Sequence, residues 1–308
     1  MLKTESPPPQ GQALDQCPTP QLLAWLVDDQ QQALAAVQAA QPQLLAALEA
    51  ALPRLRRGGR LVYVGAGSSG RLGVLDGVEL TPTFSWPRER ARGLMAGGPA
   101  AMFEAQEGAE DDAGAGQREL QALGLTADDV VIALAASGGT PYVLGAVAAA
   151  REAGALCLGL ANNAGTPLLM QADIGILLDT GPELIAGSTR LKAGTAQKIA
   201  LNTLSTALMV GLHRVHGCWM VDMRAGNAKL RRRALALAER LGRASPEAAQ
   251  EALTACDGEL KPAILMLRSR LDASAARALL QRCDGNLRQA LAMSGVADDE
   301  GAAPPGKT

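Results

Sequence analysis

The chain has 308 residues, of which 48% are hydrophobic and 19% are charged, and its formal net charge is −2. This length allows one principal domain with a sizeable core and a smaller second part, and the near-neutral charge gives no broad attraction for nucleic acid. Because the chain has only three Trp, two Tyr and two Phe, we expect an aliphatic core.

Five cysteines are widely spaced, without a C-x-x-C motif and without the Cys/His pairing of a zinc site. This pattern argues against a disulfide framework and against a zinc site, and it favours a reducing compartment. The N-terminus has no apolar segment of the signal-peptide kind, and no run reaches about 18 uninterrupted apolar residues. We therefore expect a cytoplasmic protein that binds neither membrane, nucleic acid nor metal.

Residues 1–19 are rich in proline and glutamine, and we expect an extended segment there. Apolar residues recur at helical spacing from residue 20 to residue 55, and the pattern ends at Pro53 and an Arg-Arg-Gly-Gly run. Strand-like apolar runs then alternate with helical segments, near residues 60–64, 92–95, 129–134, 155–160 and 173–178. This alternation predicts an α/β fold with a five-stranded parallel sheet flanked by helices.

Two further helical spans, 191–214 and 224–242, complete a principal domain that we expect to cover residues 20–242. Three polar residues interrupt the apolar pattern of the first span, and a solvent-exposed face is their simplest interpretation: Lys198, Asn202 and Ser205.

The character of the sequence changes after Gly242. The segments CDGELKPAIL (256–265) and CDGNLRQALA (283–292) align at a spacing of 27 residues. Each combines a helix end, an Asp-Gly turn and a new helix start. We expect a small helical module over residues 243–296 that resembles a ubiquitin-associated domain, followed by a disordered tail over 297–308.

Two segments share the order strand, Gly/Ser turn and helix: GGRLVYVGAGSSG (58–70) and DDVVIALAASG (128–138). A turn of this kind directs backbone N–H groups and serine hydroxyls toward an anion, and the positive end of the helix dipole adds to the attraction. Two such turns after neighbouring parallel strands could close on one ligand from two directions. The sequence therefore predicts a phosphate site.

The first turn also matches the G-x-G-x-x-G spacing of dinucleotide-binding proteins, through Gly65, Gly67 and Gly70. A dinucleotide site requires a carboxylate about 20 residues further on to hold the ribose hydroxyls. The corresponding stretch is Ser-Trp-Pro-Arg-Glu-Arg, in which Glu89 is flanked by two arginines. The pattern therefore favours a compact phosphate monoester over a pyrophosphate.

Candidate proton-transfer groups are few. Asp76 and Glu79 form one acidic cluster, and the string Gln-Glu-Gly-Ala-Glu-Asp-Asp (106–112) forms another. An exposed acidic surface is the simplest interpretation of both on composition alone. His213 and His216 could share a metal ion, but no third ligand is near them in sequence, so charge pairing at a helix C-terminus is favoured.

A series of ordered strings extends along the chain: GAGSSGRLGVLDGVELTPTF (65–84), AGGPAAMFEAQEGAEDD (96–112), AASGGTPYVLGA (135–146), GSTRLKAGTAQK (187–198) and MVDMRAGNAKL (220–230). Together they closely resemble the N-acetylmuramic acid 6-phosphate etherases, which belong to the sugar isomerase (SIS) fold superfamily. The resemblance runs from Thr4 through the C-terminal module. It implies a cytoplasmic, cofactor-free homodimer that cleaves the D-lactyl ether of N-acetylmuramic acid 6-phosphate, giving N-acetylglucosamine 6-phosphate and D-lactate in cell-wall sugar recycling.

The resemblance also implies roles for individual residues. Glu79, before a Pro-Thr-aromatic turn, would protonate the departing lactyl oxygen, and Glu110, in the Glu-Gly-Ala-Glu-Asp string, would be the base at C2 of the sugar. Phosphate and sugar hydroxyls would be held by Ser68, Ser69, Gly70, Ser137, Gly138 and Thr140, with Ser188, Thr189 and Lys192 as further candidates.

The sequence departs from the family pattern at two places. The family usually has Arg where this chain has Gly139, and the absence of that arginine would weaken substrate binding or alter specificity. The family also usually has Glu-Cys-Pro-Pro in place of residues 79–82.

Nine residues of helix from Gly70 to Glu79 would span about 13 Å, which is longer than a hexose phosphate bridges. Either this helix is short and bends back, or the site is shared between two subunits, which we favour.

Two other classes of function compete with an etherase. One is a non-catalytic sugar-phosphate regulator on the same fold, such as the glucokinase regulatory protein or an SIS-type transcription regulator; the latter lacks support because no helix-turn-helix is recognisable. The other is a sugar-phosphate isomerase or a nicotinamide-dependent enzyme, and the missing ribose carboxylate counts against a nicotinamide site.

Overall fold

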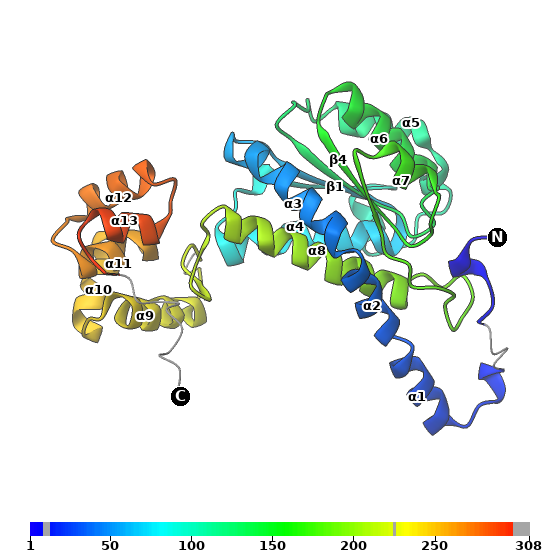
Figure 1. Cartoon of the computed structure of the whole chain (residues 1–308), viewed down its shortest axis with the longest axis horizontal. Helices are drawn as coiled ribbons and strands as arrows, with labels where there is room; N and C mark the ends of the chain where they lie inside the picture. The colour runs from blue at the N-terminus through cyan, green and yellow to red at the C-terminus, as the bar shows by residue number, and fades with distance from the viewer. Residues whose placement is uncertain (9–12, 224–225, 298–308) are drawn as a thin grey trace. The chain divides into compact units, whose positions relative to one another are not determined.

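A computed structural model describes residues 1–8, 13–223 and 226–297. The chain forms two compact units, one of Met1–Val78 with Pro87–Ala207 and one of Glu79–Trp86 with Leu208–Thr308 (Figure 1). The domain limits inferred from the sequence, at residues 19, 242 and 296, stay predictions.

The first unit contains a five-stranded parallel sheet in the order β2-β1-β3-β4-β5. The strands are β1 (Leu61–Gly65), β2 (Ala91–Met95), β3 (Val130–Leu134), β4 (Leu156–Ala161) and β5 (Ile174–Leu177). Each strand overlaps an apolar run of the sequence, and the prediction of an α/β fold with a five-stranded parallel sheet is confirmed. Gly65 at the end of β1 pairs with Leu134 at the end of β3, so the turns that follow these strands start at the same level.

Helices cover both faces of the sheet (Figure 1). They are α3 (Gln41–Arg56), α4 (Gly67–Phe84) and α8 (Lys192–Gly211) on one side, and α5 (Ala113–Gln121), α6 (Pro141–Glu152) and α7 (Pro167–Gln171) on the other. Successive strand side chains point to opposite faces. Val62 and Val64 of β1 therefore pack in a cluster with Val143 of α6, whereas Tyr63 lies close to Gly73 and Gly77 of α4.

The helical stretch predicted over residues 20–55 is divided into α1 (Thr19–Asp28), α2 (Gln31–Ala39) and α3. Pro42 lies in the first turn of α3, where its missing N–H costs nothing but prevents the preceding helix from continuing. Two short 3-10 turns, η1 (Lys3–Glu5) and η2 (Leu14–Gln16), come before α1.

The second unit contains a helical C-terminal region, as predicted, made of α9 (Ala228–Gly242), α10 (Pro246–Ala255), α11 (Leu260–Arg268), α12 (Ala273–Arg282) and α13 (Leu287–Met293). The two aligned segments adopt the same turn. Asp257 and Asp284 have positive φ angles of 53° and 50°, and the glycine after each donates its N–H to a carbonyl five residues earlier at 2.8 Å. A short hairpin of β6 (Val215–His216) and β7 (Trp219–Met220) was not predicted, because two-residue strands carry no periodicity.

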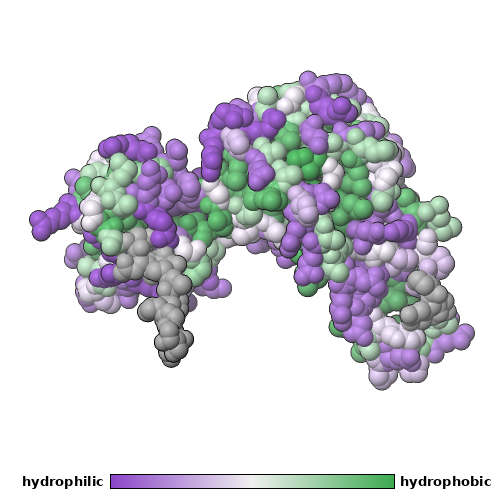
Figure 2. Space-filling view, in the orientation of Figure 1, coloured by the Kyte–Doolittle hydropathy of each residue, from purple (hydrophilic) through white to green (hydrophobic). Residues whose placement is uncertain are grey.

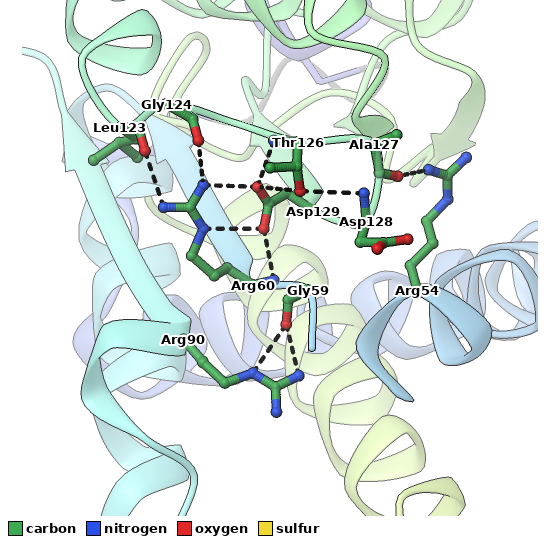
Figure 3. Close-up of polar contacts among 10 residues, drawn as sticks. All are labelled: Arg54, Gly59, Arg60, Arg90, Leu123, Gly124, Thr126, Ala127, Asp128 and Asp129. Carbon is green, nitrogen blue, oxygen red and sulfur yellow. Dashed lines mark hydrogen bonds and ion pairs between the residues drawn. The ribbon is translucent and has the colours of Figure 1, made fainter. Parts of the chain in front are cut away.

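A buried ion pair joins the beginnings of β1 and β3, at the edge of the sheet opposite to the Gly/Ser turns (Figure 3). Asp129 is 2% exposed and accepts hydrogen bonds from the Arg60 guanidinium at 3.0 and 2.7 Å. The backbone N–H groups of Arg60 and Thr126 donate to the same carboxylate, both at 2.8 Å. Burial alone would raise the pKa of Asp129, but the hydrogen bonds from Arg60 and Thr126 outweigh it and lower this pKa below its ordinary value.

We expect Asp129→Asn to lower the free energy of unfolding by about 3 kcal/mol at neutral pH, because it removes the charged partner of the partly buried Arg60. A carboxylate with a lowered folded pKa stabilises the fold above its unfolded pKa of about 3.9 and loses this effect as the pH falls through the folded value. The difference between the native protein and the variant should therefore shrink below about pH 4. Denaturant unfolding at a series of pH values measures it.

The neighbouring Asp128 supplies the control. Its ion pair with Arg57 is exposed, so Asp128→Asn should change the free energy of unfolding by less than about 1 kcal/mol. Equal losses in the two variants would show that the buried position of Asp129 has no special importance.

Candidate functional site

The two Gly/Ser turns lie next to one another at the carboxyl edge of the sheet, because β1 and β3 are parallel neighbours. The first turn leads directly into α4 and the second directly into α6. Both helices therefore begin at this edge with the positive ends of their dipoles and their unpaired N–H groups. Such an arrangement can hold an anion between two helix N-termini.

Gly70 and Gly138 give the two turns their shape. Gly70 lies in the first turn of α4, where its N–H donates to the Ala66 carbonyl at 3.0 Å, and a Cβ at this position would lie 2.8 Å from the backbone of Gly65. Gly138 has a φ of 70° and donates its N–H to the Ala135 carbonyl at 2.9 Å, and a Cβ there would overlap the side chain of Thr166. Glycine is needed at both positions for close approach of the backbone; a ligand contact by either stays a prediction.

Hydroxyl groups of four predicted site residues lie in the first turn of α4 and in the turn before α6. Ser68, Ser137 and Thr140 are half-buried and Ser69 is buried. The Ser137 and Thr140 hydroxyl oxygens are 3.4 Å apart, and Ser137 Oγ accepts the N–H of Gly139 at 3.2 Å. The structure therefore places the Ser137 and Thr140 hydroxyls side by side; that Ser68 and Ser69 share one site with them stays a prediction. Gly139 is exposed, and nothing lies within 4 Å of a Cβ built on it, so the turn has room for a side chain there.

Glu110 lies near the same edge, in the short 3-10 turn Ala109–Asp111, which packs against α6. The helices α5 and α6 touch backbone to backbone, since a Cβ at Gly116 or at Gly145 would overlap a carbonyl oxygen of the other helix. Their C-terminal ends are joined by a hydrogen bond of 3.3 Å from Gln121 Nε2 to Glu152 Oε2. The two helices thus run in the same direction, and their N-terminal ends bring the exposed Glu110 segment and the second Gly/Ser turn to one edge.

The other acidic cluster divides into a buried and an exposed carboxylate. Asp76 is 4% exposed and accepts hydrogen bonds from Tyr63 at 2.8 Å, Asn202 at 2.6 Å and Ser205 at 3.1 Å. Burial, and then the Asp76 charge, raises the pKa of Tyr63 well above its ordinary value. A surface interpretation of Asp76, Asn202 and Ser205 is therefore wrong, because these groups satisfy one another between α4 and α8.

Glu79 is exposed on α4, which is continuous from Gly67 to Phe84. The alternative in which this helix is short and bends back is wrong. Nine residues of such a helix span about 13 Å, and a site shared between two copies of the chain stays a proposal.

Lys192, which the sequence suggests as a ligand-binding residue, is buried at the start of α8 and paired with other side chains. Lys192 is 1% exposed, and its ammonium donates to Asp29 Oδ1 at 2.7 Å and to Gln32 Oε1 at 2.9 Å. Ser188 and Thr189 are half-buried in the preceding loop. A ligand contact by any of the three stays a prediction, but a phosphate that reached Lys192 would compete with its ion pair.

Glu183 was not singled out from the sequence. Its carboxylate is fully buried and accepts the N–H groups of Lys192 and Ala193 at 3.2 and 3.0 Å, and thereby caps α8. Burial raises the pKa of Glu183 despite these hydrogen bonds. Since the Glu183 carboxylate already occupies the N-terminus of α8, this helix has fewer free N–H groups for binding an anion than α4 and α6 have. No spacing rule finds such a cap nine residues before the helix.

Within the described residues, no group of three or more His, Cys, Asp or Glu side chains is placed to hold a metal ion. His213 lies just after α8, and His216 lies in β6 and is buried. No helix of the described residues is long and apolar enough to cross a membrane.

Comparison with known proteins identifies the family. Residues 43–151 match the glucokinase regulatory protein N-terminal SIS domain, and residues 110–207 match the SIS domain. An N-acetylmuramic acid 6-phosphate etherase from Deinococcus radiodurans is 59% identical over 271 residues, which is 88% of this chain and 89% of that protein. One from Streptomyces avermitilis is 48% identical over 88% of this chain and 87% of that protein.

Among solved structures, a phosphoheptose isomerase from Francisella tularensis aligns with a TM-score of 0.46 and 19% identity, over 62% of this chain and 97% of that one. That similarity is too distant to identify a function. The identity to the named etherases extends over most of both chains, and the protein belongs to the N-acetylmuramic acid 6-phosphate etherase family.

Proposed function

We propose that this protein cleaves the D-lactyl ether of N-acetylmuramic acid 6-phosphate, giving N-acetylglucosamine 6-phosphate and D-lactate in the recycling of peptidoglycan. The observation that carries this proposal is the 59% identity to an etherase of that name over 88% of the chain. The paired Gly/Ser turns add a place for the phosphate, and the nearby Glu110 segment adds a carboxylate.

The reaction is an elimination followed by an addition, which makes the enzyme a carbon–oxygen lyase. When the sugar opens to its aldehyde, the C2 proton becomes acidic, and the lactyl oxygen at C3 is β to the developing carbanion. A base removes the C2 proton, the C3–O bond breaks, and an acid protonates the departing lactyl oxygen. Water then adds at C3 of the enal, and a proton returns to C2. Each half needs one base and one acid, which two carboxylates can supply.

The structure supports a division of roles between two exposed carboxylates. Glu110 is the base at C2, near the turn where Ser137 and Thr140 hold their hydroxyls together. Glu79 is the acid at the lactyl oxygen, contributed to this site by a second copy of the chain. Ser68 and Ser69 bind the phosphate from the side of α4.

A homodimer completes this proposal. Leu75 and Val78, which precede Glu79 on α4, are 47% and 64% exposed. Hydrophobic residues also interrupt the polar surface of the sheet-containing unit in Figure 2. A second copy that covers the apolar face of α4 would remove these side chains from water and bring Glu79 to the partner's site. We place the homodimer in the cytoplasm.

The deciding experiment is incubation of the purified protein with N-acetylmuramic acid 6-phosphate and an assay for D-lactate. Release of D-lactate together with N-acetylglucosamine 6-phosphate supports the etherase. Tight binding of a hexose 6-phosphate without turnover would instead identify a regulator, and ketose formation would identify an isomerase.

We expect Gly138→Ala to weaken the binding of N-acetylglucosamine 6-phosphate about tenfold or more. The positive φ and the overlap of the new methyl group with Thr166 would force the second turn to move, at a cost of about 1–3 kcal/mol. Titration calorimetry measures the affinity. Gly139→Ala is the matched control, since its Cβ meets nothing within 4 Å and its effect should be much smaller. Equal effects would argue against a role for the turn's shape.

A further inference from the structure

Thr4 is fixed at the carboxyl edge of the sheet by all of its polar groups. The side chain is 1% exposed, its N–H donates to Asn163 Oδ1 at 3.3 Å, and its hydroxyl accepts from Asn163 Nδ2 at 3.0 Å. Its carbonyl accepts the N–H of Gly187 at 2.8 Å. These bonds offset part of the backbone entropy that is lost when the segment 1–8 is ordered.

Asn163 also forms a hydrogen bond with the second Gly/Ser turn. It is 2% exposed, and its Nδ2 also donates to the carbonyl of Ala136, directly before Ser137, at 2.9 Å. Its own carbonyl accepts the hydroxyl of Thr166 at 3.2 Å. Thr166 in turn packs where a Cβ of Gly138 would be. Thr4 is therefore linked through one buried asparagine to both sides of the turn.

Gly187, whose N–H donates to the Thr4 carbonyl, belongs to a second loop with predicted site residues. It has a φ of 79° and comes directly before Ser188 and Thr189. One residue of the segment 1–8 thus holds two loops that the sequence assigns to one site. The neighbouring Lys3 contributes much less, because its ion pair with Asp179 is exposed on both sides.

We propose that Thr4 is a positioning residue for the sugar-phosphate site, and that residues 1–8 are a fixed part of this site. This inference rests on the function proposed above. Thr4 touches no substrate; it satisfies the buried amide of Asn163 and so holds the turn 137–140 and the loop 187–189 in their binding positions. Loss of its hydroxyl would leave one donor of Asn163 buried without a partner, which costs more than loss of an exposed bond.

Steady-state kinetics with three substitutions test the proposal. Thr4→Val keeps the shape and removes the hydroxyl, and it should raise KM for N-acetylmuramic acid 6-phosphate about tenfold while kcat changes by less than about twofold. Thr4→Ser keeps the hydroxyl and should restore KM to near the native value. Lys3→Ala is the matched control and should resemble the native protein. An unchanged KM in Thr4→Val, or a loss confined to kcat, would overturn the proposal.

A second measurement does not depend on the reaction. Hydrogen exchange followed by mass spectrometry, without substrate, should show faster exchange over residues 137–140 and 187–189 in Thr4→Val than in Lys3→Ala. If lactate is never released but this exchange difference appears, the proposed function fails while the positioning role stands. If lactate is released and exchange is the same in both variants, the positioning role fails. Deletion of residues 2–8 should increase the exchange more than Thr4→Val does. If that deletion unfolds the protein, the comparison of Thr4→Val with Thr4→Ser tests the proposal.

Discussion

Glu79→Ala is expected to abolish release of D-lactate and still to exchange the C2 proton of N-acetylglucosamine 6-phosphate for deuterium. A general acid contributes about 10²–10⁴-fold to a rate, so the loss should be of this size. The exchange survives because removal of the C2 proton does not require the acid at C3. An enzymatic lactate assay and proton NMR of the sugar phosphate in heavy water measure the two steps separately.

The exposed position of Glu79 makes this variant informative, because its loss should leave the fold intact. Glu89→Ala removes another exposed carboxylate, from the short turn Arg88–Arg90, and serves as the control with near-native lactate release. Lactate release near the native rate in Glu79→Ala would show that its carboxylate is not the acid.

Glu110→Ala should lose both lactate release and C2 exchange, each by about 10²–10⁴-fold, because the base at C2 acts before either outcome. Glu107→Ala removes an exposed carboxylate from the same string and should change both rates by less than a factor of a few. If Glu79→Ala loses the exchange and Glu110→Ala keeps it, the two roles are reversed and the etherase function stands.

The two inactive variants together test whether the site is shared between subunits. When they are unfolded, mixed in equal amounts and refolded, half of the dimers should contain one chain of each kind. If Glu79 of one chain serves Glu110 of the other, each mixed dimer has one intact site, and about a quarter of native activity should return. A mixture that stays inactive while forming dimers would place both carboxylates in one chain's own site.

The sheet could be predicted from the sequence because each strand is a short apolar run followed by turn residues. Val62, Tyr63 and Val64 are buried on both faces, which is why the run is continuous rather than alternating. The breaks in the first helical stretch were harder to find, since α1 to α3 continue one apolar pattern with gaps of only a few residues.

The site was predicted where chemistry is local and missed where it depends on packing. The turn around Ser137 could be recognised, because its glycines, hydroxyls and helix start are consecutive. The environments of Asp76 and Lys192 could not, since Asp76 meets Asn202 126 residues away and Lys192 meets Asp29 163 residues away. Composition suggests an exposed charge in both cases, and only the assembled fold shows them paired.

Because Thr4 bonds to Asn163, the segment 1–8 of a newly made chain can dock only after residue 163 has been synthesised. At a synthesis rate of about 5–20 residues per second, the 159 residues between them take roughly 8 to 30 seconds to produce. Throughout this time the N–H and the hydroxyl of Thr4 lack the Asn163 side chain to which they bond in the folded protein. A chain arrested on the ribosome before Asn163 would already contain both Gly/Ser turns, yet the segment 1–8 would have nowhere to dock.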